Sequence, residues 1–328
     1  MRISVALATC NGDRYLWEQL YSFQTQTRLP DEVVISDDAS QDTTPELLDR
    51  FAATAPFPVR IHGSRRRLGA SGNFSKALSL TTGDVILLSD QDDSWFSHKV
   101  ETIESAFTSH PTTHLIVNDA LLTDRALAPT GLSRIDQITK ARYPLTNFVQ
   151  GACTSVTASL LGLALPIPVN ARNHDAWLHA IARLLDVRLV LPEALQYFRR
   201  HDRNKSSSPT STTSKMTLPR ATGSRIRRNF INAPPRRRHI SEELLQLETL
   251  WQWWERRWPP ESATGPIAAE GHANAALLDA RIDVGLARLR LLQQRRLCRL
   301  LPALRLLASA GASTYGGRLV LAKDLLLK

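Results

Sequence analysis

The 328-residue sequence has few of the features that mark secreted, zinc-bound or membrane-spanning chains. Its three cysteines, Cys10, Cys153 and Cys298, are odd in number and far apart. This spacing fits neither a disulfide framework nor a zinc site, and it favours a reducing compartment. No run of about 18 uncharged apolar residues occurs, so we expect no membrane-spanning helix. The N-terminus enters an apolar strand pattern at once, so we expect no signal peptide.

Charge is unevenly distributed along the chain. Residues 1–200 hold 19 Lys and Arg against 21 Asp and Glu, whereas residues 201–328 hold 22 against 10. The apolar content of 43% is ordinary for a globular protein. A nearly neutral body followed by a basic C-terminal part predicts that the C-terminal part meets an anionic surface.

The stretch from residue 84 to 95 carries the clearest chemical signal. An apolar strand pattern, Val85–Leu88, runs directly into Asp90, Asp92 and Asp93. Like charges this close repel one another, and a divalent cation with oxygen ligands relieves that repulsion. In α/β sheets, ligands bind at the carboxyl ends of the strands. The order therefore predicts a metal site that holds a phosphate-bearing substrate, with a solvated acidic turn as the alternative.

Strand and helix patterns alternate in the first half of the chain, which is typical of a parallel, doubly wound α/β sheet. We expect strands at 2–9, 33–35, 59–62 and 85–88, and helices at 15–24, 44–55 and 73–80. Further along we expect strands at 115–117 and 188–191 and a helix at 175–185. Residues 155–163 are small and apolar and fit either a strand or a helix.

The C-terminal part has a different composition. Residues 205–238 are rich in Ser, Thr, Pro and Arg, so we expect a flexible linker. Residues 239–328 predict a basic, amphipathic helical extension, with helices at 240–258 and 273–307. The extension fits peripheral attachment to an anionic inner membrane, or self-packing that includes a homodimer. Because no nucleic-acid-binding motif occurs, we expect no nucleic acid partner.

Several short motifs follow the predicted strands in a fixed order. They are Thr9-Cys10-Asn11-Gly12, Ser36-Asp37-Asp38-Ala39-Ser40-Gln41-Asp42-Thr43, Asn73-Phe74, Leu88-Ser89-Asp90-Gln91-Asp92-Asp93-Ser94-Trp95, Gly151-Ala152-Cys153-Thr154, Asn173-His174-Asp175-Ala176-Trp177-Leu178 and Tyr197-Phe198-Arg199-Arg200-His201-Asp202-Arg203-Asn204. Together they resemble the family 2 glycosyltransferases. The Ser-Asp-Gln-Asp-Asp-x-Trp form resembles the branch that includes rhamnosyltransferases of bacterial surface polysaccharides. The resemblance implies an α/β, GT-A (Rossmann-like nucleotide-sugar-binding) domain over residues 1–204.

The resemblance also implies roles for individual residues. The residues implied to bind the nucleotide sugar are Thr9, Asn11, Asp37, Asp38, Asn73, Asp90 and Asp93. Among them Asp38, or alternatively Asp37, would accept a hydrogen bond from the base, because a carboxylate suits an imide N–H or a ribose hydroxyl. The implied ligands of a divalent metal, Mg²⁺ or Mn²⁺, are Asp90, Asp92 and His201.

The implied chemistry is a single displacement that inverts the anomeric centre. Asp175 would be the general base that takes the proton from the acceptor hydroxyl. The metal would stabilise charge on the leaving nucleoside diphosphate. An acidic residue in the first turn of a helix is also favoured by the helix dipole alone, which is the simpler explanation of Asp175.

Three positions depart from the pattern of the resembled family. Ala39 stands where the family often has Gly, which makes the turn after Asp38 less permissive. Ala176 stands where a bulkier residue is usual, which alters the acceptor side. Tyr197 lies one residue early in the final motif. The spacing therefore matches the family's motif at His201 but not at Tyr197.

From these observations we expect a cytoplasmic transferase, peripheral on the inner face of the plasma membrane. It would move rhamnose from dTDP-rhamnose to a surface polysaccharide or a lipid-linked acceptor. The alternatives are a UDP-hexose or UDP-N-acetylhexosamine donor on the same fold, and a scaffold that binds sugar nucleotides without turnover. A basic nucleic-acid-binding protein is a further alternative, which salt-dependent DNA binding would reveal.

Overall fold

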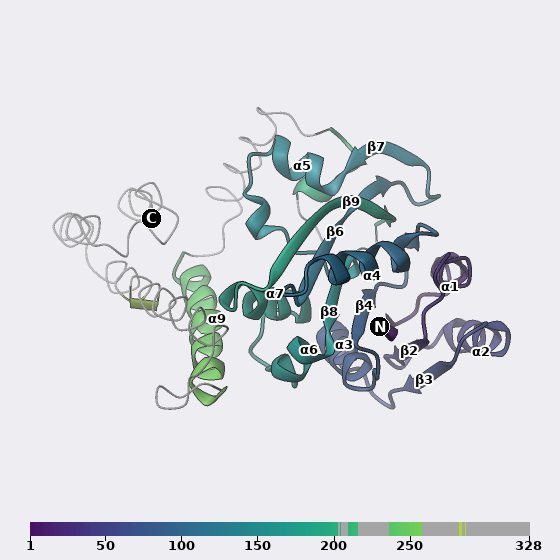
Figure 1. Ribbon diagram of the computed structural model, residues 1–328, viewed down its shortest axis with the longest axis horizontal. Coiled ribbons are helices and arrows are strands. Elements are labelled where there is room, and N and C mark those ends of the chain that lie inside the picture. The colour runs from purple at the N-terminus through teal and green to yellow at the C-terminus, as the bar shows by residue number, and fades with distance from the viewer. Residues whose placement is uncertain (203, 205–208, 216–235, 258–281, 284–285, 287–328) are drawn as a thin grey trace. The chain divides into compact units, whose positions relative to one another are not determined.

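The computed structural model describes residues 1–202, 204, 209–215, 236–257, 282–283 and 286 (Figure 1). The chain divides into two compact units. The first contains Met1–Ile167, Asn173–Arg183 and Val187–Ile226, and the second contains Pro168–Arg172, Leu184–Asp186 and Arg227–Lys328. The site described below belongs to the first unit.

The first half of the first unit alternates strands and helices as the sequence predicts. Its elements are β1 (Ile3–Thr9), α1 (Leu16–Gln24), β2 (Glu32–Asp37), α2 (Thr44–Thr54), β3 (Val59–Gly63), α3 (Gly69–Ser79) and β4 (Val85–Ser89). The strands pair in parallel in the order β3-β2-β1-β4. All of them therefore end at the same edge of the sheet. Helix α3 begins at Gly69, earlier than the predicted residue 73.

The second half is less regular. Its elements are β5 (Ser94–Trp95), α4 (Lys99–Ser109), β6 (Leu115–Thr123), β7 (Pro129–Ser133), α5 (Arg134–Lys140), η1 (Leu145–Asn147), η2 (Gly151–Cys153), β8 (Thr154–Thr157), α6 (Ala158–Ala164), α7 (His174–Leu184), β9 (Arg188–Arg199) and η3 (Pro209–Ser211). The predicted strands at 115–117 and 188–191 are present but extend further, to Thr123 and Arg199. The sequence did not predict β5, β7, α4 or α5, whose patterns are short or weakly periodic.

The sheet as a whole is mixed, although the parallel pairing expected from the first half of the chain is confirmed for β3-β2-β1-β4. Among the described residues the strand order is β3-β2-β1-β4-β8-β6-β9-β5, with β7 paired to β6. Strand β8 runs antiparallel to both β4 and β6. The segment 155–163 proves to be strand and then helix, because the Thr157 hydroxyl accepts a hydrogen bond from the backbone N–H of Leu160, at 3.3 Å, and starts α6.

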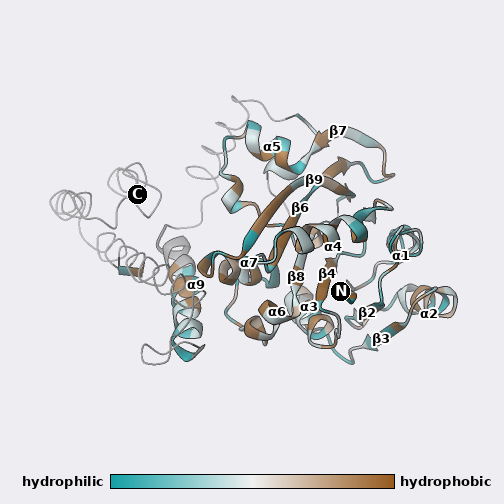
Figure 2. Cartoon of the chain, in the orientation of Figure 1, coloured by the Kyte–Doolittle hydropathy of each residue, from teal (hydrophilic) through white to brown (hydrophobic). Residues whose placement is uncertain are grey.

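The main core lies where β1, β2 and β4 pack against α1, α2 and α4. Strand residues such as Val33, Ile35 and Leu87 are fully buried there, together with Leu20 and Phe51 from the helices. Apolar residues also dominate β6 and β9 in the hydropathy view (Figure 2). Strands buried on both faces read as continuous apolar runs, which is why the start of the buried strand β6 was visible in the sequence.

Part of the stretch predicted as a linker is packed in the first unit. The segment 209–215 is bonded to α5: Arg134 Nη1 donates to Thr210 Oγ1 at 3.3 Å, and Gln137 Nε2 donates to the carbonyls of Thr212 and Ser214 at 3.2 and 2.8 Å. Thr210 and Ser211 are buried. Most of the predicted linker, 205–238, lies outside the described residues.

The second unit contains α9 (Arg236–Arg257), close to the helix predicted at 240–258. Leu244, Leu247, Leu250 and Trp254 are buried at helical spacing, so they form one apolar face. The predicted helix at 273–307 lies almost wholly outside the described residues. Over the part of the chain that is described, no helix combines the length and apolar character needed to cross a membrane.

Candidate active site

A cavity of about 590 Å³ opens at the carboxyl ends of β1 and β4. Eight of the residues predicted to bind or react line it: Thr9, Asn11, Asp38, Asn73, Asp90, Asp92, Asp175 and His201. Asp37 and Asp93 do not line it. The cavity thus brings together residues that are up to 192 positions apart in the sequence. Their roles stay predictions, and the geometry below shows what each side chain can do.

The loop after β1 is held by Gln91. Its Oε1 accepts from the backbone N–H of Cys10 at 2.7 Å, and its Nε2 donates to the Cys10 carbonyl at 3.2 Å. A Cβ on Gly12 would clash with the same Oε1, so a larger residue there would displace the Gln91 side chain from this position. Asn11 adopts a left-handed backbone with φ of 49°, which Asn tolerates better than most residues. Gln91 therefore fixes the loop that forms one wall of the cavity.

The two aspartates at the end of β2 have different partners. Asp37 Oδ1 accepts from the hydroxyls of Thr9 and Ser40 at 2.8 and 2.6 Å, and its Oδ2 accepts from the Ser40 N–H at 3.0 Å. Asp38 accepts from the backbone N–H groups of Leu68 and Gly69 at 2.6 and 2.9 Å. Asp37 therefore ties β1 to the turn after β2, and Asp38 fixes the start of α3 while lining the cavity.

Gly69 and Asn73, both in α3, complete this wall. Gly69 has φ of 75°, with open space where a Cβ would stand, so conformation rather than room requires glycine there. Asn73 is 2% exposed, and its Nδ2 donates to the Thr9 carbonyl at 2.9 Å. Asn73 Oδ1 is buried and has no hydrogen-bond partner among the described residues. A ligand in the cavity can supply a donor to this oxygen.

Asp92 and His201 meet inside the cavity. His201 Nε2 lies 2.9 Å from Asp92 Oδ2, which also accepts from Asn204 Nδ2 at 3.0 Å. Tyr15 lies against the His201 ring with a centroid separation of 4.6 Å, and the Arg199 guanidinium lies 4.5 Å from the centre of the Tyr15 ring. The imidazole is thus held on one side by an aromatic ring and on its Nε2 by a carboxylate.

Asp93 is wholly buried behind this wall. Its Oδ2 accepts from Gln196 Nε2 at 2.8 Å, and its Oδ1 accepts from the Arg199 N–H at 3.1 Å. Burial raises the pKa of Asp93 well above its ordinary value, and the charges of Asp92 and Asp90 raise it further. These contacts attach the turn after β4 to β9, and they leave Asp93 away from the sugar contact that the resemblance implies.

Asp175 lies in the first turn of α7. Asn173 Oδ1 accepts from the Ala176 N–H at 3.1 Å and so caps the helix, and Asp175 Oδ1 accepts from the same N–H at 2.8 Å. A Cβ on Gly151 would stand 3.6 Å from Asp175 Oδ2 and 3.1 Å from His174 Nε2. The absence of a side chain at Gly151 therefore leaves room beside the second carboxylate oxygen, which is the atom available to act as a base.

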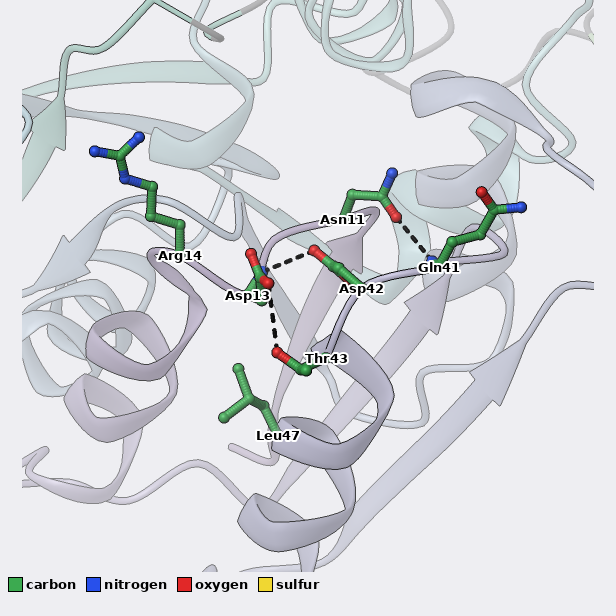
Figure 3. Close-up of a pocket in the computed structure, with 7 residues that line it drawn as sticks. All are labelled: Asn11, Asp13, Arg14, Gln41, Asp42, Thr43 and Leu47. Atoms are coloured by element: carbon green, nitrogen blue, oxygen red, sulfur yellow. Dashed lines mark hydrogen bonds between the residues drawn. The ribbon is translucent and has the colours of Figure 1, made fainter.

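A second hollow, of about 810 Å³, adjoins the loop after β1 (Figure 3). It shares Asn11 and Arg14 with the first cavity. Figure 3 shows Asp13 bonded to both Asp42 and Thr43: the Asp13 N–H donates to Asp42 Oδ2 at 3.3 Å, and the Thr43 hydroxyl donates to Asp13 Oδ2 at 3.4 Å. These bonds stabilise the approach of the loop to the start of α2.

Asp92 and His201 are the side chains of the cavity that best fit a divalent metal. Among the described residues, no three His, Cys, Asp or Glu side chains gather as a metal site. Asp92 and His201 are a carboxylate and an imidazole already within 2.9 Å of each other, which is the contact a cation would replace. A divalent ion takes further oxygens from a bound phosphate when the protein offers few ligands. The pair therefore fits a metal that arrives with a phosphate-bearing substrate.

Comparison with known proteins indicates which family the chain resembles. The family model of "Glycosyl transferase family 2" matches residues 4–119. This part of the chain is therefore similar to glycosyl transferase family 2. An uncharacterized protein of Mycobacterium tuberculosis is 29% identical over 213 residues, which cover 61% of this chain and 59% of that protein. The dTDP-rhamnosyl transferase RfbG of Shigella flexneri is 35% identical over 99 residues, or 29% of this chain and 34% of RfbG. The chain thus spans about three fifths of its mycobacterial relative.

Among solved structures, S. aureus TarS (residues 1–349), crystallised with UDP-GlcNAc, superposes with a TM-score of 0.53. The two chains are 14% identical, and the match covers 87% of this chain and 92% of TarS. At this identity the likeness establishes the fold. The predicted GT-A fold is thereby confirmed.

Sequence reasoning missed several residues of the site. Gln91 lay inside the acidic motif, but its clamp on Cys10 depends on residues 81 positions apart. Asn204 stood in the final motif without an assigned role. Tyr15 looked like the first residue of an amphipathic helix, and nothing in the pattern indicated that its buried ring would lie against His201. In each case the signal needed is a tertiary contact.

Proposed function

We propose that the protein is an inverting, metal-dependent glycosyltransferase that takes its sugar from a nucleoside diphosphate donor. The observation that carries the proposal is that one cavity contains Asp38, the Asp92–His201 pair and Asp175. Asp38 suits the nucleotide base, the Asp92–His201 pair suits the diphosphate, and Asp175 suits the acceptor hydroxyl. The match of residues 4–119 to glycosyl transferase family 2 supports the same activity.

Asp38 and Asn73 form the nucleotide end of the cavity in this proposal. Each oxygen of Asp38 already accepts one backbone N–H. A carboxylate has about four acceptor sites, so it can accept another hydrogen bond from the imide N–H of a pyrimidine. Asn73 Oδ1, buried and without a described partner, can accept a further bond from the ligand. Buried polar atoms are normally paired, and a bound nucleotide would pair this one.

Asp92 and His201 would hold a Mg²⁺ or Mn²⁺ ion, with Asp90 beside them in the same cavity. When bound, such an ion supplies positive charge to the diphosphate as the bond to the sugar breaks. Tyr15 and Arg199 keep the His201 ring in place from the protein side. The Arg199 side chain also donates to the Asp92 carbonyl at 2.8 Å, so it fixes the backbone that carries the carboxylate.

Asp175 would act as the general base. The acceptor oxygen attacks the anomeric carbon, its proton passes to Asp175 Oδ2, and the bond from that carbon to the diphosphate oxygen breaks. One displacement of this kind inverts the anomeric centre. Asp175 Oδ1 is bonded to the Ala176 N–H, so the carboxylate is oriented before the substrate arrives.

For the donor we propose dTDP-rhamnose, and for the acceptor a surface polysaccharide or a lipid-linked glycan. The similarity to RfbG, which covers 29% of this chain, supports the rhamnosyl donor. A UDP-hexose or UDP-N-acetylhexosamine is the alternative within the same chemistry. We further propose that the protein works at the cytoplasmic face of the membrane, with the basic residues 239–328 against anionic lipid.

A thermal-shift panel of nucleoside diphosphates and nucleotide sugars, with and without Mn²⁺, tests the proposal. A ligand at 100 times its Kd stabilises the native state by about 2.7 kcal/mol. For a protein of this size that is a rise in Tm of roughly 4 °C. We expect a metal-dependent rise with dTDP or UDP species that is lost in Asp92→Asn and kept in the surface control Asp49→Asn. If no nucleotide shifts the wild-type protein, the proposal is wrong.

Turnover separates an enzyme from a binding scaffold. Asp175→Asn keeps the size and the Ala176 contact of the side chain but cannot accept the proton. We expect it to bind nucleotide normally and to release nucleoside diphosphate about 100 to 10,000 times more slowly, the range for a lost general base. Equal turnover by wild type and Asp175→Asn would show that another group is the base, and no turnover by wild type with any donor would favour the scaffold.

A further inference from the structure

Lys99 is a lysine in an unusual place. It is 1% exposed, at the first position of α4, with its ammonium 4.1 Å from the centre of the Trp95 ring. Lysine is almost never fully buried unless its charge is paired. Burial lowers the pKa of Lys99 to about 8, which reflects how strongly the interior opposes its charge. Contacts inside the protein must therefore hold it there.

The Lys99 ammonium donates to two oxygens. One is the backbone carbonyl of Ala152, at 3.2 Å, and the other is Oε1 of the buried Gln196. The Gln196 amide is then oriented so that its Nε2 donates to Asp93 Oδ2 at 2.8 Å. A buried cation and a buried carboxylate are thus joined through one amide, and each limits the orientation of the next.

Both ends of this chain of contacts touch the cavity wall. Asp93 follows Asp92 directly, and its other oxygen accepts from the N–H of Arg199, two residues before His201. Ala152 follows Gly151, which lines the cavity beside Asp175. Lys99 itself does not line the cavity. It therefore stands behind two parts of the wall that come from separate segments of the chain.

We propose that Lys99 is a positioning residue that keeps the Asp92–His201 pair and the Gly151–Asp175 wall at a fixed separation, acting through Gln196, Asp93 and the Ala152 carbonyl. The inference rests on the proposed function, since it assigns Lys99 to the same reaction. A displacement of about 1 Å far from the chemistry can cost about 100-fold in rate, so the role is measurable.

The experiment compares three variants with wild type. Lys99→Met keeps the length of the side chain and removes the charge. Gln196→Met leaves Lys99 intact and removes the amide bridge. Lys140→Met is the control, because Lys140 is 39% exposed and pairs with Asp136 in its own helix, at 3.8 Å. For each variant we would measure the Kd of dTDP without metal, the Kd of dTDP with Mn²⁺, and the rate of dTDP release from dTDP-rhamnose or the donor that wild type accepts.

We expect a selective loss. Metal-free dTDP binds chiefly at the Asp38 and Asn73 wall, so its Kd should change by no more than about twofold. The gain in affinity from Mn²⁺ should fall about tenfold in Lys99→Met and Gln196→Met, as is typical when the support of a metal ligand is lost. Turnover should fall about 100-fold, while Lys140→Met behaves like wild type.

Other outcomes overturn the inference. If both variants keep the Mn²⁺-dependent gain and the turnover of wild type, Lys99 has no positioning role. If metal-free and metal-dependent binding fall together, or if both variants fail to fold, Lys99 serves folding alone. A wild-type protein that binds no nucleotide would refute the proposed function, and the inference with it. If wild type binds nucleotide and Lys99→Met keeps the same Mn²⁺-dependent gain and turnover, only the inference about Lys99 is refuted.

Discussion

Two pairs of adjacent aspartates stand at the ends of β2 and β4, the strands on either side of β1, and they divide their tasks differently. After β4 the tasks are separate: Asp92 lines the cavity and meets His201, whereas Asp93 is buried and bonded to Gln196 and the Arg199 backbone. At the end of β2 they overlap, because Asp38 both lines the cavity and bonds the backbone at the start of α3. Mutations of the pair after β4 should therefore affect either stability or ligand binding. A mutation of Asp38 at the end of β2 should affect both.

The largest expected effect is a loss of protein stability when Asp93, the buried member of the pair after β4, is replaced. Asp93→Ala removes a wholly buried carboxylate and leaves the Lys99 charge without its counterpart. Removing one partner of a buried charged pair costs about 3–5 kcal/mol of the free energy of unfolding. Chemical denaturation would measure the loss. The exposed Asp49→Ala should stay within about 0.5 kcal/mol of wild type, and a loss below about 1 kcal/mol in Asp93→Ala would contradict the role given to Asp93.

The other member of that pair should show the opposite pattern. Asp92→Asn keeps the shape of the side chain and its Asn204 neighbour but weakens any cation at Asp92 and His201. We expect turnover to fall about 100-fold, or about 2.7 kcal/mol in transition-state stabilisation, with Tm nearly unchanged. Initial rates over a Mn²⁺ titration, together with melting curves, would check this. A large fall in Tm would show that Asp92, like Asp93, serves the fold.

The β2 pair predicts linked effects of moderate size. In Asp37→Asn and in Asp38→Asn, one oxygen that accepts a backbone N–H becomes an NH₂ group, which should cost about 1–3 kcal/mol of stability in each. Only Asp38→Asn should also weaken dTDP binding, because Asp37 does not line the cavity. Isothermal titration beside denaturation would separate the two. Equal affinities in the two variants would remove Asp38 from the nucleotide site.

The sequence predicts which strands end in acidic residues, because apolar runs such as Val85–Leu88 indicate buried strands and the acidic residues follow them directly. It does not predict which member of each pair faces the cavity. That depends on partners far along the chain: Gln196 for Asp93, 103 positions away, and Leu68 for Asp38, 30 positions away. The same reason explains the mixed sheet, since the apolar segment 155–163 fits either structure until β4 and β6 pair with it.

The smallest expected effect tests the turn that joins the β2 pair to α2. Ala39 has φ of 51°, the left-handed region that favours glycine. Ala39→Gly should relieve about 1–2 kcal/mol of strain and lose about 0.4–1 kcal/mol through a freer unfolded chain, for a net gain of up to about 1.6 kcal/mol. Ala52→Gly, inside the right-handed helix α2, is the matched control and should lose about 1 kcal/mol. Melting temperatures would show whether each variant is more or less stable than wild type. A destabilised Ala39→Gly would mean that the turn bears no strain for glycine to relieve.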